Sequence, residues 1–131
     1  FGRIKKKIDL ARESLPVPVV DTMADAEIGI IASGSVDSAV IEARDLLLEE
    51  GKATDYLRIR GIPFSEEVKK FIDQHRVTYV VEVNRDGQLS QLLTMDFPEV
   101  AFKLRKVAQM DGLPLPAKWI VDEIKSYEEK K

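Results

Sequence analysis

The sequence predicts an α/β domain in which a mostly parallel sheet of about five strands lies between two layers of helices. Short apolar segments alternate along the chain with segments whose apolar residues recur at helical spacing. The two most apolar segments, residues 27–32 and 78–83, are rich in β-branched residues, which is typical of strands buried on both faces. With 131 residues the chain has the size of one domain. Strands that alternate with helices pair in parallel, so we expect a three-layer α/β/α sandwich.

Residues 1–24 are predicted to be a linker that leads into the domain. Residues 3–15 combine basic side chains with apolar residues at roughly helical spacing, and Pro16 and Pro18 would end any helix there. A short edge strand is expected around Val19, because proline is tolerated at the edge of a sheet.

Residues 25–127 are predicted to form the folded domain, followed by a frayed tail at 128–131. Gly51 stands where a glycine usually ends a helix, and Ser65 precedes two acids as an N-cap residue would. The expected strands are 27–32, 53–60, 78–83 and a segment within 100–107, and helices should follow Ser35, Ser65, Gly87 and Pro116. The strands 27–32 and 78–83 should be neighbours at the centre, with 53–60 nearer one edge.

Composition argues against several classes of function. The chain carries 20 basic and 23 acidic residues, so it has no basic surplus for nucleic acid. It has no cysteine, which rules out disulfides and iron–sulfur ligation within this chain, and its single histidine, His75, makes a metal site unexpected. No apolar run is long enough for a membrane span, so we expect a cytoplasmic protein. The start at Phe1 suggests a fragment of a longer chain.

Two turns are the candidate binding or interface site, because ligands of parallel sheets bind where neighbouring strands end. Each turn opens a helix, whose first N–H groups could bind an anion. Ordinary turn chemistry is the alternative, and no residue is assigned a catalytic role. The candidate residues are Ser33, Gly34, Ser35, Glu82, Asn84, Arg85, Asp86, Gly87 and Gln88.

The first turn also allows a different function. The segment Ser33-Gly34-Ser35-Val36-Asp37-Ser38 resembles the pyrophosphate loop of ATP pyrophosphatases, Ser-Gly-Gly-x-Asp-Ser. Ser35 occupies the second glycine position, where its Cβ would obstruct the approach of a phosphate to the backbone. An adenylating domain and a free-standing module that binds a small molecule therefore remain as alternatives.

The second turn carries a family resemblance. A buried strand ending in Glu82-Val83-Asn84, followed by Gly87-Gln88-Leu89, resembles 2-oxoacid:ferredoxin oxidoreductase alpha subunits near their C-terminus. The same family has a Gly-Ser turn after an apolar strand, a turn similar to Ile62-Pro63-Phe64 and a late segment similar to Asp111-Gly112-Leu113-Pro114-Leu115. These motifs agree in order and spacing from about Glu27 to Ile124.

The resemblance implies a fold like the transketolase C-terminal domain and a role inside a larger enzyme. Such enzymes oxidatively decarboxylate a 2-oxoacid to its acyl-CoA with thiamine pyrophosphate and magnesium, and pass electrons through iron–sulfur clusters to ferredoxin. The cofactor lies between the N-terminal domain of the alpha subunit and the beta subunit. This chain would then hold no cofactor, would be inactive alone, and would have those two parts as partners, with ferredoxin reached through the complex.

Overall fold

The protein is described by a computed structural model that covers residues 18–33, 36–59, 64–82, 88–108 and 117–129. Within them, one sheet has the strand order β1-β3-β2-β4-β5. The strands are β1 (Val19–Asp21), β2 (Ile28–Ser33), β3 (Thr54–Ile59), β4 (Val77–Glu82) and β5 (Leu104–Ala108). The helices are α2 (Asp37–Glu49), α3 (Glu66–Gln74), α4 (Gln88–Asp96), α5 (Ala117–Glu129) and the short 3-10 helix η2 (Ala101–Lys103).

The strand pairing confirms the predicted sheet. The two most apolar strands, β2 and β4, are adjacent and parallel, and β3 lies on the other side of β2, one place from the edge. β5 continues the parallel sheet beyond β4. The short edge strand β1 pairs antiparallel with β3, which makes the sheet mixed.

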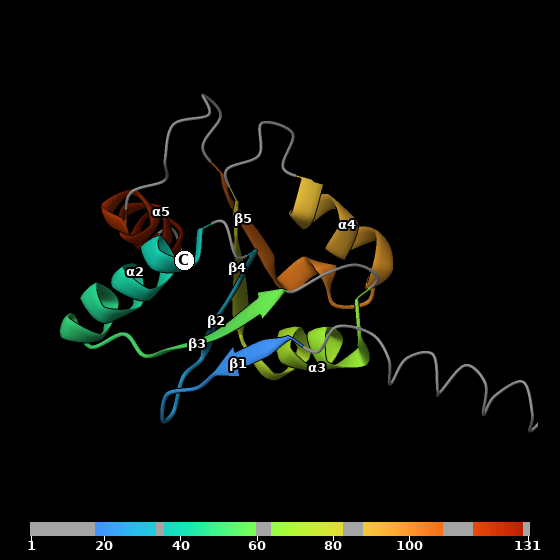
Figure 1. Cartoon of the computed structure of the whole chain (residues 1–131), viewed down its shortest axis with the longest axis horizontal. Coiled ribbons are helices and arrows are strands. Elements are labelled where there is room, and N and C mark those ends of the chain that lie inside the picture. The colour runs from blue at the N-terminus through green and yellow to red at the C-terminus, as the bar shows by residue number, and fades with distance from the viewer. Residues whose placement is uncertain (1–17, 34–35, 60–63, 83–87, 109–116, 130–131) are drawn as a thin grey trace, which may run out of the picture.

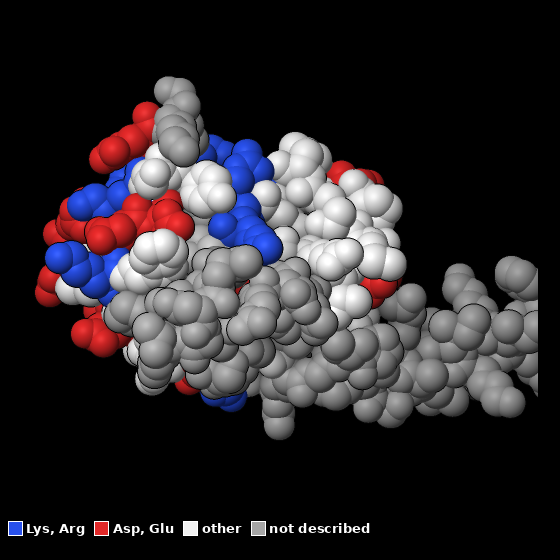
Figure 2. Space-filling model, turned by 90° about the horizontal axis from the view of Figure 1, so that it is seen from above, with Lys and Arg blue, Asp and Glu red and all other residues white. Residues whose placement is uncertain are grey.

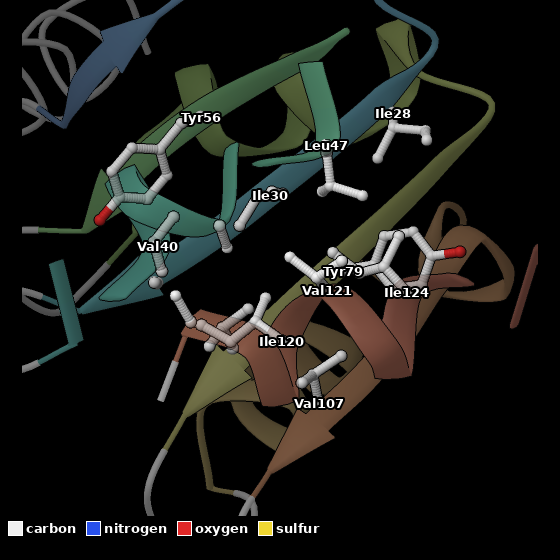
Figure 3. Close-up of a cluster of buried hydrophobic side chains, with 14 of the residues drawn as sticks. Ile28, Ile30, Val40, Leu47, Tyr56, Tyr79, Val107, Ile120, Val121 and Ile124 are labelled. Atoms are coloured by element: carbon white, nitrogen blue, oxygen red, sulfur yellow. The ribbon is translucent and has the colours of Figure 1, made fainter. Parts of the chain in front are cut away.

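Helices cover both faces of the sheet, as the three-layer prediction requires (Figure 1). Alternate residues of the central strands point to opposite faces. Ile30 and Tyr79 pack with α2 and α5 in one buried cluster, which Figure 3 shows, whereas Ile31 and Val80 pack with α3 and α4 in the other. The central strands read as continuous apolar runs because they have no solvent face.

Gly51 and Ser65 were predicted to mark helix ends, and both occupy the expected positions, but only Gly51 makes the expected hydrogen bonds. Gly51 has φ +83°, and its N–H and that of Lys52 donate to Leu48 O and Leu47 O at 2.9 Å each. This pair of hydrogen bonds is the Schellman motif, so the predicted helix end is confirmed. Ser65 does occupy the N-cap position of α3, but its hydroxyl makes no capping hydrogen bond.

The C-terminal elements differ from the prediction in two places. The last strand begins only at Leu104, because a 3-10 turn occupies residues 101–103. Of the tail predicted to be frayed at 128–131, the first two residues are helical, because α5 continues to Glu129. The Glu128 carboxylate accepts hydrogen bonds from Tyr79 Oη at 2.8 Å and Arg76 Nη2 at 2.6 Å. No helix in the described part of the chain is long and apolar enough to cross a membrane.

Candidate functional site

The two predicted turns do follow neighbouring strands. Ala32 pairs with Val81, so the last residues of β2 and β4, Ser33 and Glu82, come at the same edge of the sheet. The turn residues Gly34, Ser35, Asn84, Arg85, Asp86 and Gly87 lie outside the described residues, as do the motifs at 62–63 and 111–115. Ser33 ends β2 and Gln88 begins α4.

Glu82 acts within the domain as the cap of α4. Its side chain is buried, with 4% exposed, and its carboxylate accepts the N–H of Leu89 at 2.8 Å and of Ser90 at 3.2 Å. A carboxylate is the group that the positive end of a helix dipole favours. An anion from outside would therefore have to displace Glu82 from these two N–H groups.

Asp37, the acid of the pyrophosphatase-like segment, is also engaged inside the domain. It lies in the first turn of α2, where its carboxylate accepts hydrogen bonds from Tyr56 Oη at 2.8 Å and Arg58 Nη1 at 3.4 Å. Burial raises the pKa of Tyr56 well above its usual value, and the hydrogen bond to Asp37 raises it further. Tyr56 therefore stays a neutral donor to Asp37, and this carboxylate has two partners before any ligand arrives.

Arg44 is a buried charged residue that the sequence analysis did not single out. It lies on the apolar side of α2 with Val40 and Leu47, and 3% of it is exposed. Its guanidinium donates to Thr54 Oγ1 at 3.0 Å, to Thr54 O at 2.7 Å and to the Asp21 carboxylate at 2.7 Å. Only one sequence feature could have identified Arg44 as buried, which is that it interrupts the helical stripe of apolar residues.

His75 follows α3 as its C-cap residue. Its ring is buried, with Nδ1 2.6 Å from Phe71 O and Nε2 2.7 Å from the Asp55 carboxylate. The described residues contain no group of three His, Cys, Asp or Glu side chains that could hold a metal ion.

Two open hollows occur at the opposite, amino-terminal edge of the sheet. One has a volume of about 360 Å³ and the other about 270 Å³, and Arg76 and Glu128 line both. The larger one is lined by opposite charges, including Asp25, Glu27 and Lys52. Its charged lining residues are three acids and two bases, so its net charge is only −1. Arg76 already pairs there with Glu27 and Glu128.

Charge is unevenly distributed on the surface seen from above in Figure 2. Lys, Arg, Asp and Glu gather over the half that contains α2 and α5, whereas the half that contains α4 is largely uncharged. Asp96 is the only charged residue of α4, and Met95 on this helix is 70% exposed. A surface with few charges costs less to desolvate on contact with another protein surface.

Comparison with known proteins finds structural relatives. No protein-family model and no curated protein sequence matches the chain. A solved structure of 2-oxoglutarate:ferredoxin oxidoreductase from Magnetococcus marinus, with 2-oxoglutarate, coenzyme A and succinyl-CoA bound, matches 95% of this chain with a TM-score of 0.75 and 25% identity. The match covers 22% of that longer chain, so our chain spans about a fifth of its relative's length.

Two further structures support the fold assignment. The alpha chain of a probable 2-oxoacid ferredoxin oxidoreductase from Thermoplasma acidophilum matches 86% of this chain and 97% of its own, with a TM-score of 0.58 and 22% identity. A split-gene transketolase, described as an inactive beta4 tetramer, matches 82% of this chain and 40% of its own, with a TM-score of 0.64 and 18% identity. The predicted fold is confirmed, and the domain is structurally related to 2-oxoacid:ferredoxin oxidoreductase alpha chains.

Proposed function

We propose that this chain is the C-terminal structural and interaction domain of the alpha subunit of a thiamine-dependent 2-oxoacid:ferredoxin oxidoreductase. The observation that carries the proposal is the match to the Magnetococcus marinus enzyme, which extends over 95% of the chain. The order of the four motifs along the sequence supports it independently, because motif order and backbone similarity are different kinds of observation.

The domain's role is to pack and orient the complex, and it is inactive alone. The ionisable groups that are buried or half-buried support this role, because Glu82, Arg44 and the half-buried Asp37 each bind other groups of the domain. Thiamine pyrophosphate, magnesium and the iron–sulfur clusters would be held by other parts of the complex. The partners would be the N-terminal domain of the same alpha subunit and the beta subunit, with ferredoxin as the final acceptor.

The docking surface that we propose includes the carboxyl edge of the sheet, where the neighbouring strands β2 and β4 end, and the uncharged surface of α4. Glu82 joins the two, because it ends β4 and caps α4. In this proposal the candidate residues of the two turns contact the other parts of the enzyme rather than a free ligand.

The test is assembly of the alpha subunit with the beta subunit, followed by oxidation of the 2-oxoacid with CoA and a dye acceptor. Met95→Glu places a charge on α4 at an exposed position and should reduce assembly at least about tenfold, as expected for a desolvated interface position. Leu48→Glu is the matched control, because Leu48 is exposed on α2 in the charged half, and it should leave assembly unchanged.

Two results would contradict the proposal. One is turnover by the isolated, monodisperse chain with thiamine pyrophosphate, CoA and the 2-oxoacid. The other is normal assembly and turnover by an alpha subunit that lacks this domain. If Met95→Glu assembles normally while deletion of the domain abolishes assembly, the function stands and the proposed docking surface is wrong.

A further inference from the structure

The segment before β2, residues 18–27, is attached to the domain by different forces from those that hold the rest. In sequence order, the first member of each hydrophobic cluster is a residue of β2, so neither cluster contains a residue of this segment. Within the segment Pro18 is buried, but Val19 and Val20 are 43% and 44% exposed. Regions with few buried apolar contacts open at lower free energy than the core.

Arg44 holds the middle of this segment. Its guanidinium donates to the Asp21 carboxylate at 2.7 Å and reaches Asp21 O at 3.4 Å. The Asp21 side chain is 71% exposed, whereas that of Arg44 is 4% exposed. When Asp21 leaves, water can replace it, while Arg44 keeps both of its hydrogen bonds to Thr54, at 3.0 Å and 2.7 Å. Opening therefore leaves no buried cation without a partner.

Asp55 holds the end of the segment in the same way. Its Oδ1 accepts the N–H of Met23 at 2.8 Å, and its Oδ2 lies 2.7 Å from His75 Nε2. Release of Met23 would leave Asp55 bound to His75. Arg44 and Asp55 are therefore similar anchors, because each has one set of hydrogen-bond partners inside the domain and another on the segment.

A change of backbone conformation separates the segment from the core strand β2. Asp25 has φ +59°, the only non-glycine residue with positive φ in the described part of the chain. Asp tolerates this left-handed conformation better than most residues, and positions that absorb large φ/ψ changes serve as hinges. Ile28, the first residue of β2, is already in the hydrophobic core.

We propose that residues 18–24 form a detachable strap, which opens as a unit about Asp25 while the parallel sheet β3-β2-β4-β5 stays folded. The strap is held by its short antiparallel pairing with β3, by the anchors Arg44 and Asp55, and by the hydrogen bond from Thr54 N–H to Met23 Sδ at 3.4 Å. Its release uncovers the edge of β3, and an uncovered edge can pair with another strand. The strap is thus a conformational device that controls access to the edge of β3. This inference does not rest on the proposed enzyme function.

Native-state hydrogen exchange of the 131-residue chain tests the strap directly. Amides of residues 19–23 should exchange at least about 100-fold faster than those of β2 and β4, because local opening needs less free energy than global unfolding. Asp21→Ala removes an exposed anchor group and should speed exchange of the strap about three- to tenfold, with β2 and β4 unchanged. Arg44→Met should have a larger effect on the same amides.

Arg105→Met is the control, because Arg105 lies on the opposite edge strand and donates to the nearby carbonyls of Phe102 and Leu104. It should leave the strap unchanged. The proposal is overturned if strap amides exchange together with β2 and β4, or if Asp21→Ala leaves their rate unchanged. Because Asp21 is exposed, this variant tests the idea even if Arg44→Met does not fold.

Discussion

Replacing Glu82 by Ala removes the cap of α4 and should destabilise the domain by about 2–3 kcal/mol. The carboxylate is buried and accepts two backbone N–H groups, at 2.8 Å and 3.2 Å. Loss of a capping side chain costs about 1 kcal/mol, and a buried donor left without an acceptor costs about 1–3 kcal/mol more. The hydrogen bond to Ser90 is the longer of the two, and water can reach the helix end. The total cost should therefore be smaller than the sum of the largest values.

Glu82→Gln tests which property of the side chain matters. The amide keeps one acceptor oxygen, but its NH₂ group must face a second N–H, so two donors meet. It also loses the charge that favours the helix N-terminus. We expect about 1–2 kcal/mol for this variant, less than for Ala, because one of the two hydrogen bonds survives.

Equilibrium unfolding in urea measures both changes. With a slope of about 2 kcal/mol per M, the midpoint should fall by roughly 1 M for Glu82→Ala. Glu42→Ala on the exposed side of α2 is the control and should change stability by less than about 0.5 kcal/mol. If the free energy of unfolding of Glu82→Ala lies within about 0.5 kcal/mol of that of the unmodified protein, the capping argument fails.

Two further predictions concern packing and pH. Gly29→Ala should cost about 1–3 kcal/mol by overpacking, since its Cβ would lie 2.8 Å from Phe71 Cε1 and 3.0 Å from Thr78 Oγ1. Gly51→Ala has free space but φ +83°, so it should cost only about 1 kcal/mol in backbone strain. A Gly29→Ala variant with the same urea midpoint as the unmodified protein would refute the packing argument. Burial raises the pKa of Tyr56 and of Tyr79 well above the usual value, so their contribution to stability is complete below about pH 10 and is lost as the pH rises further. The urea midpoint should therefore begin to fall as the pH rises above about 10. A Tyr79→Phe variant whose midpoint falls just as steeply as that of the unmodified protein would argue against a role for Tyr79.

Glu82 has an internal role that the structure shows and an interface role that is proposed. Glu82 was predicted to be part of a binding or interface surface, and the structure shows its carboxylate on the N–H groups of α4. Assembly measured for Glu82→Gln as well as for Met95→Glu tests whether Glu82 also contacts a partner. A variant that loses assembly but keeps its urea midpoint would separate the two roles.

Much of the fold follows from patterns within single segments. The helical spacing of Val40, Ala43 and Leu47 predicts α2, and the apolar runs around Ile30 and Val80 predict two strands buried on both faces. Burial on both faces requires a central position, so even the adjacency of β2 and β4 could be predicted. These properties are local, because each depends on residues within about ten positions of one another.

The polar contacts depend on the tertiary structure alone. Arg44 meets Thr54 and Asp21, which lie 10 and 23 residues away, and His75 meets Asp55 from a distance of 20 residues. These partners share no spacing rule, because the order of strands in the sheet decides which side chains face each other. The sequence by itself therefore determined the layers, the central strands and the helix that ends at Gly51. The tertiary structure decided which buried charges pair, since pairing requires two distant segments to arrive at one place.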